Sequence, residues 1–472
     1  MSLREELMNL KKNFVSVSAT RFALFSALVR VVRNGSACMG FGWSPCQLHP
    51  VSASKLFVHI FVLAAIAVGL AACNSSKRSV DYYDKQATDP YVIKVCEPDE
   101  NNFYYSRIPG PAVLHAVGVA PDKLADGWTV STLEKEGIDP EVIDELLQAA
   151  ENGEFPNVDS ILIARNGKLV LEAYFNGFDR EKKHRIYSAT KSFASALVGI
   201  AIDKGLITDI NQPVSSYFPD YWPEIENGGA LKNSLTLAHL LTMTAGVDLK
   251  PVWKNDDQRN NVIKYSSDWV KTKLDFPITR QPGTQFDYDS SNTFLIGQIV
   301  ARVAEEPLLA FSKKHLFDPL GISHYCNLEN LNGQAIPNNG LILRSRDMLK
   351  FGQLYLDDGV WNGRRIISEQ WVADSTRRHI STAAISQKKD GPQGYGYQWW
   401  TGKKNDDGQH YYYAVGHGSQ IIMILPFWNM VVVFTSNEWA DLVLNDEHIT
   451  KILEDHIPRA VLKRRKAAGV SG

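Results

Sequence analysis

Two β-rich segments separated by a turn dipeptide constrain the fold of this chain more than any other feature. Residues 159–175 read DSILIARNGKLVLEAYF, and Asn166-Gly167 divides them into two halves. Asn-Gly is typical of a tight hairpin, because both central residues of such a turn need a positive φ. A helix is predicted soon afterwards, over residues 188–204, because apolar residues recur there at helical spacing and Gly205 follows as a stop signal.

Strand patterns return near the C-terminal end, while helix and loop patterns dominate between residues 206 and 390. Strands are predicted at 397–401, 411–415, 420–425 and 430–435, and helices at 236–243, 291–304 and about 441–457. This order predicts a mixed α/β (α+β) fold in which N- and C-terminal strands form one antiparallel sheet flanked by helices. A mostly helical lobe at about 206–390 is inserted, and the whole domain spans 121–460.

The composition excludes several classes of function. The chain has 472 residues, with 50 Lys and Arg against 52 Asp and Glu and a formal net charge of −2. Balanced charge without a long basic run argues against nucleic acid as a partner. The 5 Cys include no C-x-x-C pair, and the chain contains neither a Gly-rich phosphate loop nor an H-E-x-x-H pair. We therefore predict an enzyme-sized globular protein that uses no cofactor and no metal.

An apolar run, LFVHIFVLAAIAVGLAA, occupies residues 56–72 and ends at Cys73. A membrane helix needs about 20 apolar residues, so the run better fits the apolar region of a signal peptide. Leu70-Ala71-Ala72-Cys73 resembles the lipobox of bacterial lipoproteins, which implies that Cys73 is diacylated. The residue after Cys73 is Asn74 and not Asp, and in Gram-negative lipoproteins this favours onward transfer to the outer membrane. An uncleaved membrane anchor is the alternative.

These features divide the chain outside the folded domain. We predict an over-extended N-terminus at 1–50, a lipoprotein signal peptide at 51–73, a tether at 74–120 and a basic tail at 461–472. The expected location is the bacterial cell envelope, where the protein faces the periplasm and contacts the membrane through the lipid on Cys73. In that oxidising compartment Cys96 and Cys326 could form a disulfide, although the sequence does not show whether they are close.

Ser188 and Lys191 form a Ser-x-x-Lys pair at the start of the predicted helix. Residues three apart share a helical face, so the Lys amine can reach the Ser hydroxyl. That hydroxyl becomes a nucleophile when a base takes its proton, and a Lys is such a base when burial or a nearby charge lowers its pKa. Other Ser-x-x-Lys matches, at 52–55 and 386–389, lie in the signal and in a polar loop. The alternative is that Ser188 only caps the helix and Lys191 lies on the surface.

Two further motifs follow Ser188 in order. A turn leading into a helix places Tyr288 and Ser290 near the helix mouth, and Gly416-His417-Gly418-Ser419-Gln420 opens a predicted strand. Together with the segments 235–246, 340–355 and 394–400, these motifs resemble the serine β-lactamase/penicillin-binding superfamily. The resemblance covers about 125–440 and is to the class C-like branch, which holds esterases and 6-aminohexanoate-dimer hydrolases.

The resemblance implies a role for each motif. Ser188 is the expected acylated nucleophile, Lys191 its base partner and Tyr288 the proton shuttle to the leaving group. The backbone N–H groups of Ser188 and Gln420 are the expected oxyanion hole. The expected substrate-binding residues are Ser290, His417, Gly418 and Ser419. Simpler alternatives are that Tyr288 packs at a turn and that His417 is structural.

Departures from the family pattern indicate the substrate class. Tyr288-x-Ser290 stands where β-lactamases of this branch carry Tyr-x-Asn, and His417-Gly418-Ser419 stands in place of Lys-Thr-Gly. The missing Lys removes a cation that would pair with a β-lactam carboxylate. We therefore expect a serine hydrolase that cleaves an ester or amide bond of a small acyl or peptide-like substrate. The alternatives are a D-amino-acid peptidase or carboxypeptidase acting on cell-wall peptides, and a non-catalytic protein that binds peptidoglycan fragments.

Overall fold

A large antiparallel sheet joins strands from both ends of the folded part of the chain. The computed structural model describes residues 92–97, 113–114, 119–155, 158–225, 229–247, 263–382, 394–404, 410–436 and 455–461. The predictions for 1–50, for the signal peptide with Cys73 and for nearly all of the basic tail lie outside the described residues. Of the terminal helix predicted at about 441–457, only residues 455–457 are described; they are helical, and the helix continues to residue 461.

The large sheet has ten strands and runs in the order β11-β12-β13-β14-β15-β16-β4-β5-β2, with β3 beside β5. The strands are β2 (Val113–Leu114), β3 (Thr129–Val130), β4 (Val158–Arg165), β5 (Lys168–Tyr174), β11 (Ile380–Ser381), β12 (Gly394–Tyr395), β13 (Trp400–Lys404), β14 (His410–Gly416), β15 (Gln420–Leu425) and β16 (Met430–Ser436). C-terminal β16 pairs antiparallel with N-terminal β4, so that Val432 lies opposite Ile163. The predicted antiparallel sheet built from both ends of the domain is therefore confirmed.

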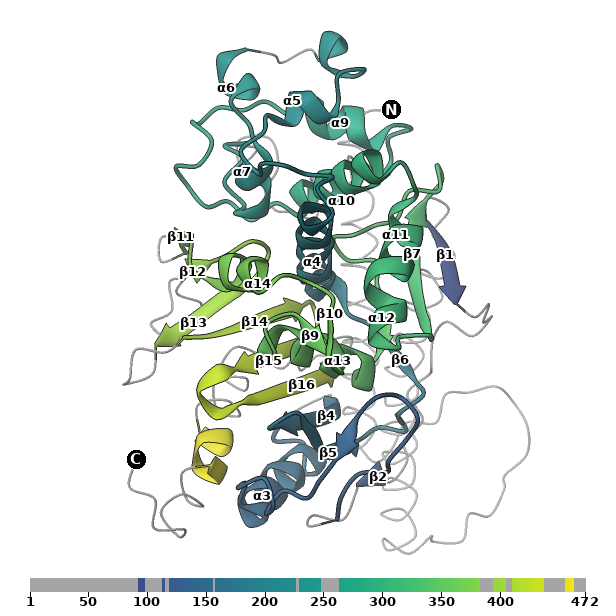
Figure 1. Cartoon of the computed structure of the whole chain (residues 1–472), viewed down its shortest axis with the longest axis vertical. Helices are drawn as coiled ribbons and strands as arrows, with labels where there is room; N and C mark the ends of the chain where they lie inside the picture. Colours follow the sequence, from purple (N-terminus) through teal and green to yellow (C-terminus); the bar gives the residue numbers. More distant parts are fainter. Residues whose placement is uncertain are drawn as a thin grey trace, which may run out of the picture. The chain divides into compact units, whose positions relative to one another are not determined.

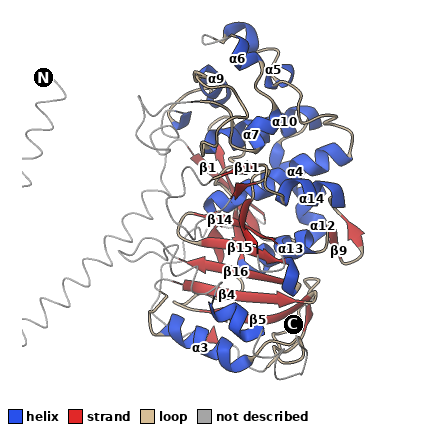
Figure 2. Ribbon diagram, turned by 90° about the vertical axis from the view of Figure 1, so that its left-hand side faces the viewer, coloured by secondary structure: helices blue, strands red, loops and turns tan. Residues whose placement is uncertain are grey.

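Alternating side chains cover the two faces of this sheet, as strand geometry requires. Leu162 and Val433 belong to the core that includes α4 (Thr190–Asp203) and α13 (Ser345–Leu356). Ile161 and Val432 instead pack with α3 (Pro140–Glu151) and the terminal helix. Figure 2 shows α3 and α13 on either side of the strands. Because both faces are covered, the central strands are apolar almost throughout.

The predicted hairpins form where the turn residues stand. Asn166 and Gly167 take φ values of 52° and 71° between β4 and β5, so the Asn-Gly prediction is confirmed. The hairpin between β15 and β16 contains the short 3-10 helix η4 (Pro426–Trp428) and Asn429 at φ 48°. The predicted strand at 397–401 begins later, at Trp400, because Gln398 adopts φ 65° and breaks the extended backbone before it.

The inserted region contains helices, as predicted, but it is not simply a helical lobe. Its helices include α5 (Val214–Tyr217), η2 (Trp222–Glu224), α6 (Ala230–Asn233), α7 (Leu237–Leu241), α9 (Trp269–Asp275), α10 (Ser290–Ala304), α11 (Leu308–Ser312), the π-helical η3 (Lys313–Phe317), α12 (Asp318–Leu320) and α14 (Glu369–Thr376). In Figure 1, α4 stands between the group around α7 and α10 and the strands of the large sheet. By contrast α13 packs directly on β4, β15 and β16.

Strands inside the predicted helical lobe require a correction. β7 (Tyr325–Asn330) and β8 (Ile342–Arg344) form a second sheet with β1 (Val92–Glu97) and β6 (Lys183–Arg185), in the order β1-β7-β8-β6. A two-stranded ribbon of β9 (Val360–Trp361) and β10 (Arg364–Arg365) adds further strand structure. β1 and β6 pair with strands far along the chain, and β8, β9 and β10 have only two or three residues each, so a local pattern gives little sign of them.

The predicted tether at 74–120 is also corrected. β1 pairs antiparallel with β7 and a disulfide joins Cys96 to Cys326, whose Cα atoms are 4.0 Å apart. β2 pairs with the edge of β5. At least residues 92–97 and 113–114 therefore belong to the folded domain, and the open question of whether the two Cys are close is answered.

Candidate active site

The turn that carries Ser188 joins the second sheet to a largely buried helix. The short 3-10 helix η1 (Tyr187–Ala189) runs directly into α4, in which residues 190–201 are all buried. Tyr187 adopts φ 46°, a left-handed conformation that is uncommon for a residue with a side chain. Ser188 itself is only partly buried, so the turn presents its hydroxyl at the end of an otherwise enclosed helix.

Lys191 lies one turn further along and is buried, with 2% of its surface exposed. Its Nζ donates hydrogen bonds to Ser188 Oγ at 2.9 Å and to the backbone carbonyl of Asn338 at 3.0 Å. The alternative in which Lys191 lies on the surface is therefore wrong. The amine instead lies in a dry site and contacts the hydroxyl directly, which is the geometry that a base partner needs.

The segment before β8 holds the Ser188 turn in place. Ile186 donates its backbone N–H to the carbonyl of Leu341, and Leu341 donates its own N–H to Thr190 Oγ1. Asn338, the acceptor for Lys191, belongs to the same segment. Asn338 could not be identified from the sequence, because it acts through its backbone carbonyl and lies 147 residues from Lys191 in the chain.

Tyr288 lies beside Lys191, just before α10. Its ring centroid is 5.0 Å from Lys191 Nζ. The ring stacks on Trp400 at 5.7 Å, and Tyr395 meets it edge-on at 6.5 Å. Burial, with Tyr288 as a smaller cause, raises the pKa of Tyr395 well above its usual value, so Tyr395 stays protonated. The structure thus brings Ser188, Lys191 and Tyr288 together and backs the phenol with an aromatic wall.

A buried ion pair anchors the residue next to Tyr288. Asp289 is the N-cap of α10 and accepts a hydrogen bond from the backbone N–H of Ser291. Lys273 of α9 pairs with the Asp289 carboxylate at 2.5 Å, and each side chain is only 3% exposed. Sequence reasoning missed this pair, because Lys273 follows no recognisable motif and its partner lies on another helix. Ser290, the predicted substrate-binding residue, is the first residue of α10 and is 4% exposed.

The third motif forms the turn between β14 and β15 and lies against the Ser188 turn. The Tyr187 and His417 ring centroids are 5.7 Å apart, and His417 is exposed. Gly418 and Ser419 adopt φ values of 69° and 59°, and Gln420 is the first residue of β15. The His417 side chain is therefore placed at the open side of the site.

Gly416 is required for this close approach. A Cβ atom at residue 416 would lie 2.0 Å from the backbone oxygen of Ile186. Any side chain there would push β14 away from the turn that carries Ser188. The glycine before His417 therefore lets the third motif reach the nucleophile turn, although its contact partner cannot be read from the sequence.

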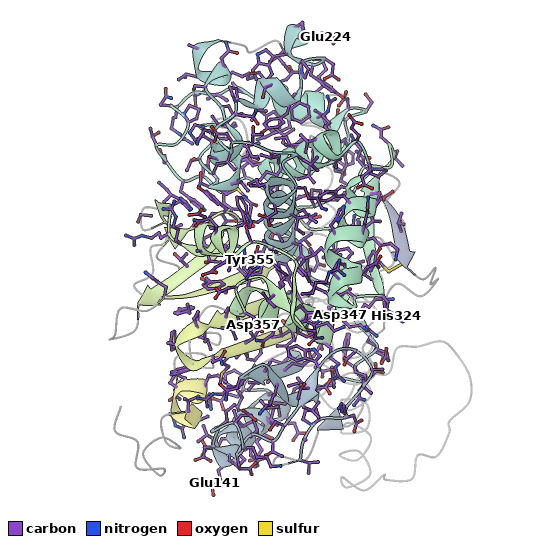
Figure 3. The ribbon with its side chains drawn as sticks, viewed as in Figure 1. Glu141, Glu224, His324, Asp347, Tyr355 and Asp357 are labelled. Carbon is purple, nitrogen blue, oxygen red and sulfur yellow. A yellow bond between two sulfur atoms is a disulfide. The ribbon has the colours of Figure 1, made fainter. Side chains whose placement is uncertain are left out.

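The two adjacent Trp residues divide between core and site. Trp399 is fully buried and packs on Tyr355 of α13 at 4.5 Å, whereas Trp400 is partly exposed beside Tyr288. On α13 the buried Asp347 pairs with Lys350 at 3.1 Å; Figure 3 labels Asp347 and Tyr355. Lys350 also donates to the carbonyl of Gly321, so this second group of buried charges ties α13 to its neighbours.

The described residues contain neither a candidate metal site nor a candidate membrane-spanning helix. No group of three or more His, Cys, Asp or Glu side chains in the described ranges is arranged to hold a metal ion. None of the helices that the structure describes is both long enough and apolar enough to cross a bilayer. What the described part offers is a serine hydroxyl hydrogen-bonded to a buried amine, with a tyrosine ring beside that amine.

Comparison with known proteins identifies the family. The Beta-lactamase family model matches residues 148–456, which is more than half of the chain. The chain therefore belongs to the Beta-lactamase family, whose fold is that of serine hydrolases and penicillin-binding proteins. The resemblance inferred from the three motifs is confirmed.

The relatives of this chain include hydrolases. The chain is 26% identical over 300 residues to the 6-aminohexanoate-dimer hydrolase of Paenarthrobacter ureafaciens, covering 60% of this chain and 73% of that protein. A putative 6-aminohexanoate-dimer hydrolase from Bacillus anthracis shares the fold, with a TM-score of 0.55, 20% identity and coverage of 68% of this chain and 83% of that chain. A family VIII carboxylesterase has a TM-score of 0.52, 16% identity and coverage of 68% and 96%.

Proposed function

We propose that this protein is a serine hydrolase that cleaves an ester or amide bond of a small acyl substrate through an acyl-enzyme at Ser188. The observation that carries the proposal is the hydrogen bond of 2.9 Å between Lys191 Nζ and Ser188 Oγ inside a buried site. Membership of the Beta-lactamase family supports the same chemistry. A non-catalytic binding protein would have no physical need for a buried amine aimed at a hydroxyl.

The proposed reaction begins with transfer of the Ser188 proton to the Lys191 and Tyr288 pair. Ser188 Oγ then forms a bond to the substrate carbonyl carbon, and the carbonyl oxygen becomes an oxyanion. The backbone N–H groups of Ser188 and Gln420 are its proposed donors, each typically worth about 10²–10³ in rate. Collapse of this intermediate breaks the bond to the alcohol or amine, which leaves with a proton from Tyr288. Water then hydrolyses the acyl-enzyme and restores Ser188.

The proposed substrate contacts follow from the residues around Ser188. The proposed binding residues are Ser290, His417, Gly418 and Ser419, and the stacked rings of Tyr288 and Trp400 form the proposed apolar wall. His417 stands where the family pattern has a Lys ammonium, so a substrate carboxylate is not a required feature. Small esters and amides without an anionic group are therefore the preferred class.

Labelling with a fluorophosphonate tests the nucleophile without a guess at the substrate. The full chain, purified in detergent, is incubated with the probe and digested, and the modified peptide is mapped by mass spectrometry. We expect the adduct on Ser188 and its loss in Ser188→Ala, together with hydrolysis of short nitrophenyl esters by the wild type alone. Absence of both labelling and turnover in the wild type would support the peptidoglycan-binding alternative instead.

We also propose that the protein is exported and anchored by a lipid on Cys73. The Cys96–Cys326 disulfide supports this location, because structural disulfides persist in oxidising compartments such as the bacterial periplasm. Two acyl chains would give a stable anchor. Labelling of growing cells with a palmitate analogue is expected to mark the wild type and to leave Cys73→Ala unmarked. Equal labelling of the two proteins would contradict the anchor.

A further inference from the structure

Gln398 occupies a backbone position that a residue with a side chain rarely adopts. Its φ is 65°, in the left-handed region where glycine is the least strained residue. It lies between β12 and β13, just before the buried Trp399, and only 2% of its own surface is exposed. Residues with such strained backbone are often found at functional sites, where the surrounding structure holds them in place.

Each polar group of Gln398 has a partner on an element that surrounds the site. The backbone N–H donates to the carbonyl of Leu241, and the side-chain Nε2 donates to the carbonyls of Leu240 and Leu241 at 3.2 and 2.8 Å. The side-chain Oε1 accepts from Thr293 Oγ1 at 2.6 Å. The backbone carbonyl accepts from Ser192 Oγ at 2.8 Å. A glycine would fit the backbone but would lose every side-chain bond.

These partners lead directly to the proposed proton-transfer pair. Ser192 follows Lys191 on α4, while Thr293 lies in the first turn of α10, the helix that Tyr288 precedes. The end of α7, held by Gln398, continues to Met243, whose carbonyl accepts the backbone N–H of Asp287. Gln398 therefore connects both helices whose relative position determines how far Lys191 lies from Tyr288.

We propose that Gln398 is a positioning residue that fixes the separation of Lys191 and Tyr288 by joining α4, α7 and α10. This inference rests on the proposed hydrolase function and adds a residue that touches neither the substrate nor the reacting atoms. Its loss lets α10 and α4 shift relative to each other. Misplacement of reacting groups by about 1 Å can cost about 10²-fold in rate, so the effect falls on the chemical step.

The test compares three substitutions with two matched controls. Gln398→Gly keeps the left-handed backbone and removes the side-chain bonds, Thr293→Val removes the partner of Oε1, and Ser192→Ala removes the partner of the backbone carbonyl. Asn429→Gly is the control for a left-handed residue in the β15–β16 hairpin. Ser195→Ala is the control for a hydroxyl on α4, where Ser195 interacts with Tyr355.

Each full-length variant is measured for fluorophosphonate labelling rate, for kcat and KM on a nitrophenyl ester, and for melting temperature. We expect Gln398→Gly to lower the labelling rate and kcat by about 10-fold to 10²-fold, with KM changed by less than about twofold. Thr293→Val and Ser192→Ala should show smaller losses of the same kind, and both controls should match the wild type. If Gln398→Gly does not fold, these two variants decide the question.

The outcomes separate this inference from the proposed function. A wild type that is not labelled refutes the hydrolase proposal and the inference with it. A labelled wild type, with all three variants within about twofold of it in kcat, refutes the positioning role and leaves the hydrolase intact. The positioning role is also refuted if kcat and KM change together in step with melting temperature, because that pattern indicates general loss of structure.

Discussion

His184 offers a prediction whose size follows from its surroundings. The ring lies in β6, stacks on Phe178 at 4.3 Å and contacts Thr435 Oγ1 through Nε2 at 3.1 Å. Burial lowers its pKa from the usual 6.5 to about 3. Because the folded form resists protonation, the unfolded chain binds a proton first as pH falls below 6.5. Folding stability is therefore complete above pH 6.5 and declines as the pH approaches 3.

The expected loss can be calculated for pH 5, about 1.5 pH units below the unfolded pKa. At 1.36 kcal/mol per unit, this one ring removes about 2 kcal/mol of unfolding free energy between pH 7 and pH 5. Urea unfolding of the wild type and of His184→Gln at both pH values measures the difference. His184→Gln should lose about 2 kcal/mol less than the wild type over this interval. Equal losses in the two proteins would refute the reasoning.

Three further predictions concern the site. Lys273→Met should lower the unfolding free energy by about 3–5 kcal/mol, because it leaves the Asp289 carboxylate buried and unpaired. Adding Asp289→Asn to this variant should recover part of the loss. If urea unfolding shows no recovery, the result argues against the ion pair. Lys191→Ala and Tyr288→Phe should each lower kcat by about 10²-fold to 10⁴-fold with little change in KM, as measured by steady-state kinetics. An unchanged kcat in either variant would exclude proton transfer by the residue that was replaced. Nitrocefin, a chromogenic β-lactam, should be cleaved poorly, because His417 stands where β-lactamases carry a Lys that pairs with the substrate carboxylate. If absorbance assays show turnover of nitrocefin as fast as that of nitrophenyl esters, the argument from His417 is contradicted.

Features encoded by neighbouring residues could be predicted from the sequence. Asn166-Gly167 defines a hairpin by local backbone preference, and the spacing of Ser188 and Lys191 brings them together on one helical turn. The order of strands and helices was sufficient for the sheet that joins both ends of the domain. Tyr288 was located because its motif lies at a helix start, where an aspartate caps α10.

Features that depend on distant partners could not be predicted. β1 pairs with a strand far along the chain, and its cysteine forms a disulfide across a sequence separation of 230 residues. Gln398 contacts Ser192 across 206 residues, and its left-handed backbone has no signature in a run of aromatic residues. Lys273 is one Lys among many in the sequence. Its importance comes from burial beside Asp289, and burial is decided by the assembled fold.

The pairing of β1 with β7 would limit the reach of a lipid anchor at Cys73. Because the folded domain includes Val92, the proposed lipid would be separated from it by residues 74–91 alone. A segment of that length spans at most about 60 Å, whereas a segment to residue 120 would span about 160 Å. Lipidation at Cys73 would therefore hold the protein in a thin layer next to the membrane, where the molecules it meets would be those that diffuse along that surface.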